Sequence, residues 1–172
     1  MKTLEYTFSC YQISTENHKT VIKILEKDPA LFSLNTIYAA QTFAEAKEKM
    51  LIAYKELEDL AIVSMVSVFE QKIINHIDEI ADTIKNQNSG LAKAVIDYGL
   101  KDPGRWRFKE ILDLYKTILP SNLVGQIKQI YEFRNWVAHG KKKPKPISVD
   151  PKSACQILTE FLELADLEEH TM

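Results

Sequence analysis

An arginine and a histidine stand five residues apart in the second half of the chain, at Arg134 and His139. Both lie in the stretch YEFRNWVAHGKKKPKP, residues 131–146, where a glycine and four lysines follow the histidine. Cleaving RNA without a metal ion requires removal of the 2′-hydroxyl proton, protonation of the departing 5′ oxygen, and a cation beside the phosphate oxygens. Histidine can perform the first two tasks and arginine the third. The pair therefore indicates phosphodiester chemistry.

The lysines after the histidine could hold a phosphate backbone without reading base sequence. They are Lys141, Lys142, Lys143 and Lys145. Residues 93–152 contain 13 Lys or Arg against 6 Asp or Glu, a local charge of +7 in a chain whose net charge is −2. This concentration favours a phosphate-facing side, and the alternative is a solvated loop that is rich in lysine.

The composition is typical of a single soluble globular domain, with 172 residues, 45% of them hydrophobic and 27% charged. No apolar run reaches the roughly 18 residues that a membrane span needs, and the N-terminus lacks the apolar core of a signal peptide. We therefore expect a cytoplasmic protein. The histidines and cysteines lack metal-ligand spacing, and no glycine-rich phosphate loop is present, so we expect neither a metal nor a cofactor.

The remaining patterns predict an all-α fold, a compact antiparallel bundle of about five to six helices that forms a homodimer. After Asn35 and Thr36, either of which could cap a helix, no glycine or proline occurs before residue 89. Because this run is long for one bundle helix, we expect two helices with a break between residues 54 and 59. The first half of the second helix should be the central and most buried part, because LAIVSMVSVF is apolar on nearly every side. The apolar residues of the second helix also recur at helical spacing. These are Ile62, Val66, Phe69, Ile73, Ile77, Ile80 and Ile84.

The helix that carries the arginine and the histidine should follow Pro120, with Ser121 or Asn122 as its cap, and should end at Gly140. Two shorter helices are expected within residues 88–120.

A loop should follow over residues 140–150, because two prolines and the lysine run cannot continue a helix. The last helix should then open on Asp150 and Pro151. Its buried face should consist of Ala154, Leu158, Phe161 and Ala165.

Residues 1–34 form a separate N-terminal extension in this reading, ahead of a helical domain over residues 35–172. The segment TLEYTFSCYQI alternates like a strand, and a short helical stretch follows it and ends at Asp28 and Pro29.

The position of Arg134 within its own helix is unusual. Leu123, Ile127, Ile130, Arg134 and Val137 recur at spacings of four and three residues. Arg134 thus occupies a place that the pattern reserves for a buried apolar side chain. A guanidinium there needs a carboxylate, a subunit interface or an anionic ligand. Glu70, which follows Phe69 on the central helix, is the candidate carboxylate.

The sequence RNWVAH, residues 134–139, resembles the motif of the HEPN superfamily (higher eukaryotes and prokaryotes nucleotide-binding domain), an arginine and a histidine separated by four to six residues. The segment SMVSVFEQKII is similar to the central helix of several prokaryotic branches, which carries an aromatic–glutamate pair. The resemblance covers roughly residues 36–168. It implies a helical bundle, a homodimer with the motif at the subunit cleft, and metal-independent endoribonuclease activity. Members of the superfamily that have this activity are commonly toxins or antiviral defence effectors.

Carried over by motif, Arg134 and His139 would be catalytic, and Asn135 and Glu70 would support them. One branch of the superfamily, which is paired with a nucleotidyltransferase antitoxin, has a tyrosine at the position of Lys141. The lysine at this position leaves the identity of a protein antitoxin or regulator open. As partners, the resemblance implies RNA and a second copy of the chain.

A non-enzymatic interpretation accounts for the same residues. Arg134 could be a core arginine paired with Glu70, and His139 could interact with the last carbonyls of its helix. The chain would then be a catalytically inactive helical module for dimerisation or nucleotide binding.

Overall fold

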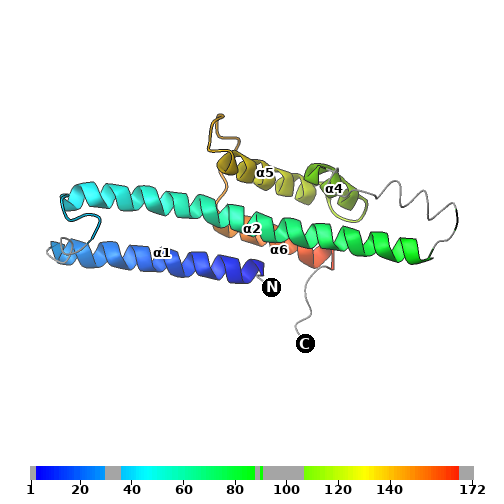
Figure 1. Cartoon of the computed structure of the whole chain (residues 1–172), viewed down its shortest axis with the longest axis horizontal. Helices are drawn as coiled ribbons and strands as arrows, with labels where there is room; N and C mark the ends of the chain where they lie inside the picture. Colours follow the sequence, from blue (N-terminus) through cyan, green and yellow to red (C-terminus); the bar gives the residue numbers. More distant parts are fainter. Residues whose placement is uncertain (1–2, 30–35, 88–89, 91–106, 167–172) are drawn as a thin grey trace.

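The computed structural model describes residues 3–29, 36–87, 90 and 107–166. These residues form five α-helices and no strand (Figure 1). The helices are α1 (Leu4–Lys27), α2 (Phe43–Gln87), α4 (Phe108–Leu114), α5 (Ser121–Ala138) and α6 (Pro151–Leu164), and a 3-10 turn, η3 (Tyr115–Thr117), follows α4. The all-α prediction is confirmed. The helix expected after residue 88 falls almost wholly outside the described residues.

A single helix of 45 residues, α2, runs along the whole length of the molecule (Figure 1). The expected break between residues 54 and 59 is therefore wrong. The segment contains no helix-breaking residue, and α1 packs beside it. Tertiary packing of this kind supplies most of the stability of a long helix, so length alone gave no reason for a break. The molecule is consequently elongated along α2.

The start of α2 is set by a capping box at Thr42 and Glu45, and not by Asn35 or Thr36. The Thr42 hydroxyl accepts a hydrogen bond from the Glu45 backbone N–H at 3.3 Å, and the Glu45 carboxylate accepts one from the Thr42 N–H at 2.8 Å. Two backbone donors at the helix end are thereby satisfied.

The segment that was predicted to be a strand belongs to the first helix, α1, so the strand prediction is wrong. Thr3 caps α1, since its hydroxyl accepts a hydrogen bond from the Tyr6 N–H at 3.1 Å. Most of the covered positions of α1 form a stripe that recurs at alternating spacings of four and three residues. They are Leu4, Phe8, Tyr11, Thr15, His18, Ile22 and Leu25. Over a few residues this stripe shares Leu4 and Phe8 with a strand-like alternation, so the short pattern could not separate the two.

Helix α1 lies beside the N-terminal half of α2 and runs in the opposite direction (Figure 1). Its first turn also reaches α6, and Leu4 belongs to the main core. Near its other end, Leu25 packs with Ala46 and Met50 of α2 in a second, smaller cluster. The N-terminal segment is thus part of the bundle packing.

The main core lies where α2, α5 and α6 meet. Ile62, Val66, Phe69 and Ile73 are all buried there, which confirms the central role predicted for this part of α2. Farther along the helix, Ile80 and Ile84 are 43% and 38% exposed. Ala154, Leu158, Phe161 and Ala165 are buried, as the apolar pattern of the last helix predicts.

One window of α2 is long and apolar enough to pass a length-and-composition test for a membrane span. Only 33% of that window is buried inside the structure. Core helices of soluble proteins pass the same test, so this feature assigns no location.

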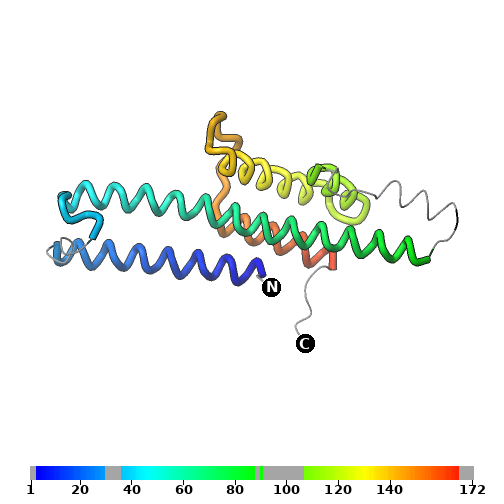
Figure 2. The backbone as a smooth tube through the Cα atoms, viewed as in Figure 1, coloured from blue at the N-terminus to red at the C-terminus, as the bar shows by residue number. Residues whose placement is uncertain are grey.

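The loop after α5 brings the chain across α2 to α6. Figure 2 shows the tube leave the end of α5, turn back on itself and descend past α2 before α6 begins. Helix α6 then starts as predicted, with the Asp150 carboxylate accepting a hydrogen bond from the Ser153 N–H at 3.0 Å and Pro151 in the first turn.

Candidate functional site

The C-terminal end of α5 positions His139. The helix is helical through Ala138, and His139 is its C-cap residue. Gly140 has a positive φ of 75°, its N–H donates to the Val137 carbonyl, and the Lys141 N–H donates to the Trp136 carbonyl, both at 2.9 Å. This pair of bonds is a Schellman motif, which ends a helix at a left-handed glycine. The predicted helix end is confirmed, and it leaves the imidazole at the C-terminal end of α5.

Arg134 contacts the carboxylate that the sequence analysis named. Its Nη2 lies 3.4 Å from Oε2 of Glu70 on α2. Its Nη1 donates to Oδ1 of Asn135 at 2.9 Å, and the guanidinium carbon lies 5.7 Å from the centre of the Tyr131 ring. The Nε atom is buried and makes no hydrogen bond within the described part of the chain. Arg134 is thus a half-buried cation held by one carboxylate and one amide.

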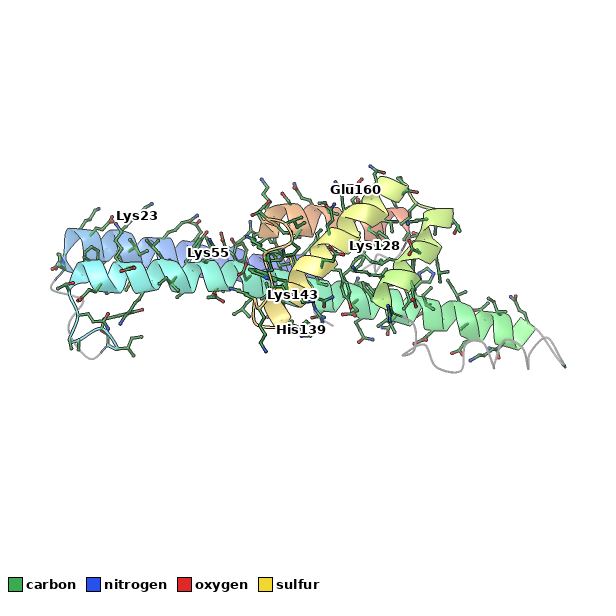
Figure 3. The ribbon with its side chains drawn as sticks, turned by 90° about the horizontal axis from the view of Figure 1, so that it is seen from above. Lys23, Lys55, Lys128, His139, Lys143 and Glu160 are labelled. Carbon is green, nitrogen blue, oxygen red and sulfur yellow. The ribbon has the colours of Figure 1, made fainter. Side chains whose placement is uncertain are left out.

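A groove of about 530 Å³ lies beside the end of α5. It is lined by Glu132, Asn135, Trp136, His139, Lys142, Lys143, Pro144 and Pro146. The groove therefore brings His139 and Asn135 together with two of the predicted phosphate-binding lysines, and Figure 3 shows His139 and Lys143 at the same end of α5. Arg134 is not one of the described residues that line the groove. Asn135 connects the two, since it lines the groove and accepts a hydrogen bond from Arg134.

The lysine-rich loop folds back onto α5 and is fixed there by side chains. The Trp136 indole Nε1 donates to the Lys143 carbonyl at 2.5 Å. Lys145 places its Nζ 5.3 Å from the centre of the Phe133 ring and 3.5 Å from the Ser148 hydroxyl. Trp136 therefore anchors the loop, a role that its sequence position did not reveal.

Lys141 points to α2 instead of the groove. Its Nζ lies 2.8 Å from Oδ2 of Asp59 and also contacts the Glu56 carboxylate. The hydrogen bonds that the Lys141 ammonium group donates to these two carboxylates, Asp59 first, raise the pKa of Lys141 above its ordinary value. The structure thus separates Lys141, which is engaged by two acids, from Lys142 and Lys143. Asp59 and Glu56 were not among the predicted site residues, although an acidic pair one turn apart on the central helix was the available signal.

The arrangement offers acid–base and electrostatic chemistry. Among the described residues that line the groove, the imidazole of His139 can exchange a proton, the amide of Asn135 can donate a hydrogen bond, and the ammonium groups of Lys142 and Lys143 can neutralise an anion. Within the described residues, no group of three or more His, Cys, Asp or Glu side chains could hold a metal ion.

No family model, curated protein or solved structure matches the chain.

Proposed function

We propose that the chain is a metal-independent endoribonuclease of HEPN type, which acts as a homodimer in the cytoplasm as a toxin or antiviral defence effector. The observation that carries the proposal is the convergence of His139, Asn135, Lys142 and Lys143 on one groove, with Arg134 bound to Asn135.

In the proposed reaction, the 2′ oxygen of a ribose attacks the adjacent phosphorus and the bond to the 5′ oxygen breaks. One imidazole accepts the 2′-hydroxyl proton, and a second protonated group gives a proton to the 5′ oxygen. The products are a 2′,3′-cyclic phosphate and a free 5′-hydroxyl, so the cleavage step consumes no water. His139 has the chemistry for either proton transfer, and a guanidinium would stabilise the charge on the phosphate oxygens.

A second copy of the chain would complete this set. Among the described residues, His139 is the single histidine that lines the groove of one chain, and Arg134 contacts the lining residue Asn135 without lining the groove itself. A two-fold dimer that brings two α5 ends together would place a second His139 and a second Arg134 next to each groove. The lysines would hold the RNA backbone on either side without reading its sequence.

The test is cleavage of a labelled RNA in the presence of EDTA. The wild-type protein should cleave it, and His139→Ala should not, with unchanged circular dichroism and melting temperature. His76→Gln is the matched control, because His76 lies on α2 against Tyr115 and outside the groove. If His139→Ala cleaves as fast as the wild type, the proposed function is wrong.

One observation favours the non-enzymatic alternative, a helical module for dimerisation or nucleotide binding. The guanidinium of Arg134 already has partners in Glu70 and Asn135, so its role could be structural. In that case Arg134→Ala and His139→Ala lower the melting temperature and no cleavage is seen in any variant. A regulator or antitoxin is a separate question, and growth arrest on expression of the chain alone would point to one.

A further inference from the structure

Among the described residues, Lys141 alone forms ion pairs between the loop after His139 and another helix. Its two partners, Glu56 and Asp59, stand one turn apart on α2. Asp59 is 8% exposed and is one of only two buried polar side chains in the described structure. A buried carboxylate needs a partner, and the ammonium group of Lys141 is that partner.

The backbone of Lys141 is held in an uncommon conformation. Its φ is 57°, in the left-handed region that side chains other than glycine rarely adopt. Gly140 before it is also left-handed, with a φ of 75°. A lysine persists in this region only where its surroundings determine the conformation, and here the bond to the Trp136 carbonyl and the two carboxylates do so.

Helix α2 therefore holds the motif from both sides. Glu70 contacts Arg134, which comes before the histidine, and Asp59 contacts Lys141, which comes after it. The two carboxylates are eleven residues apart, which places them about 20° from each other around α2 and roughly 16 Å apart along it. Both anchors thus project from one face of a single continuous helix.

We propose that Lys141 is a positioning residue, which fixes the place of His139 relative to Arg134 by tying the chain beyond the histidine to α2. The kinetic part of this inference rests on the proposed ribonuclease function. Lys141 itself does not touch RNA in this assignment, because its ammonium group is engaged by Asp59 and Glu56. A group that keeps the imidazole in place acts on the rate of the chemical step more than on binding.

The first test is the imidazole signal of His139 in a two-dimensional carbon–proton NMR spectrum, assigned by its absence from His139→Ala. Lys141→Met keeps the apolar stem and removes the charge, and Asp59→Asn removes the opposite charge. Both should shift or broaden the His139 signal and leave that of His76 in place. Asp113→Asn is the control, because it removes a carboxylate that binds Lys116 and Lys128 away from the groove. This measurement needs no enzymatic activity, so it decides the inference even if the wild type cleaves no RNA.

The second test is steady-state cleavage. Lys141→Met and Asp59→Asn should lower kcat by about tenfold to a hundredfold while KM stays within about twofold. Lys141→Arg, which can reach both carboxylates, should retain most of the activity. Should Asp59→Asn not fold, Glu56→Gln replaces it, since the Glu56 side chain is 56% exposed. An unmoved His139 signal in folded Lys141→Met overturns the proposal, and so does a raised KM with unchanged kcat, which would make Lys141 an RNA contact.

Discussion

Arg134 on α5 and Glu70 on α2 contact each other across 64 residues of sequence, with Nη2 and Oε2 3.4 Å apart. Their side chains are 25% and 22% exposed, so the pair is neither fully solvated nor fully buried. Asn135 accepts the second hydrogen bond of the guanidinium, and it also lines the groove that contains His139.

Removing the guanidinium should destabilise the fold. We expect Arg134→Ala to lower the free energy of unfolding by about 1–2 kcal/mol, less than a fully buried pair would cost, because Glu70 loses its partner but keeps some solvent. Urea denaturation of Arg134→Ala, Glu70→Gln and the double variant measures the coupling, which should be roughly 0.5–1.5 kcal/mol. The more exposed pair Lys47–Glu26 is the control. A coupling as large in that control would contradict the importance assigned to burial.

Two lysines should contribute to the salt dependence of RNA binding, and a third should not. In a His139→Ala background, which prevents cleavage, Lys142→Ala and Lys143→Ala should each reduce the slope of log K against log salt by roughly 0.7. Lys141→Met should leave the slope unchanged, because its charge is already engaged by Asp59 and Glu56. Fluorescence anisotropy with a labelled RNA over a range of salt concentrations gives these slopes. A reduced slope for Lys141→Met would place that lysine on the RNA.

The cap of α6 should make stability depend on acid pH. Hydrogen bonds from Ser153 hold the pKa of Asp150 below its ordinary value. Because the folded pKa is the lower one, the stabilisation is present above the ordinary pKa of about 4 and is lost as pH falls through the folded value. Asp150→Ala should cost about 1 kcal/mol at neutral pH, and Asp150→Asn should cost less and show a shallower loss of stability in acid. Thermal unfolding between neutral and acid pH checks both. Equal pH dependence in Asp150→Asn and the wild type would exclude this role for Asp150.

Shortening each of two isoleucines of α2 should have very different effects on the free energy of unfolding. Ile73 is fully buried in the main core, whereas Ile80 is 43% exposed. We expect Ile73→Ala to lower the free energy of unfolding by about 2–5 kcal/mol, since it loses burial and leaves a cavity. Ile80→Ala should change it by less than about 1 kcal/mol. Denaturant unfolding of both variants makes the comparison, and similar losses would show that Ile80 is covered in solution.

Local signals in the sequence were enough for two of the helix ends. They were not enough for the start of α5, where the N-cap residue is Pro120 in place of Ser121 or Asn122, or for the start of α2. Gly140 marks the end of α5, and Asp150 with Pro151 marks the start of α6, because each acts through its own backbone conformation or nearest donors. The misfit of Arg134 on an apolar face led to Glu70, since a buried cation has few ways to be satisfied.

Other errors arose where distant packing decides the structure. The continuity of α2 depends on α1, which packs alongside it, and α1 was itself assigned a strand from an alternation too short to separate the two periods. The sequence also did not show that Lys141 pairs with α2 whereas Lys142 and Lys143 line the groove. Nothing in the run KKKPK distinguishes Lys141 from its neighbours until α2 brings Asp59 and Glu56 beside it.

The unbroken course of α2 constrains how the chain can change in length. Inserting or deleting one residue between Asp59 and Glu70 would rotate one carboxylate by about 100° relative to the other and move it by roughly 1.5 Å along the axis. One of the two contacts with the α5 end would then be lost, although each residue that makes them would still be present. The same change beyond Ile73 would leave both carboxylates in register. The stretch between them therefore has a fixed length, a requirement that comes in addition to the buried side chains that it supplies to the main core.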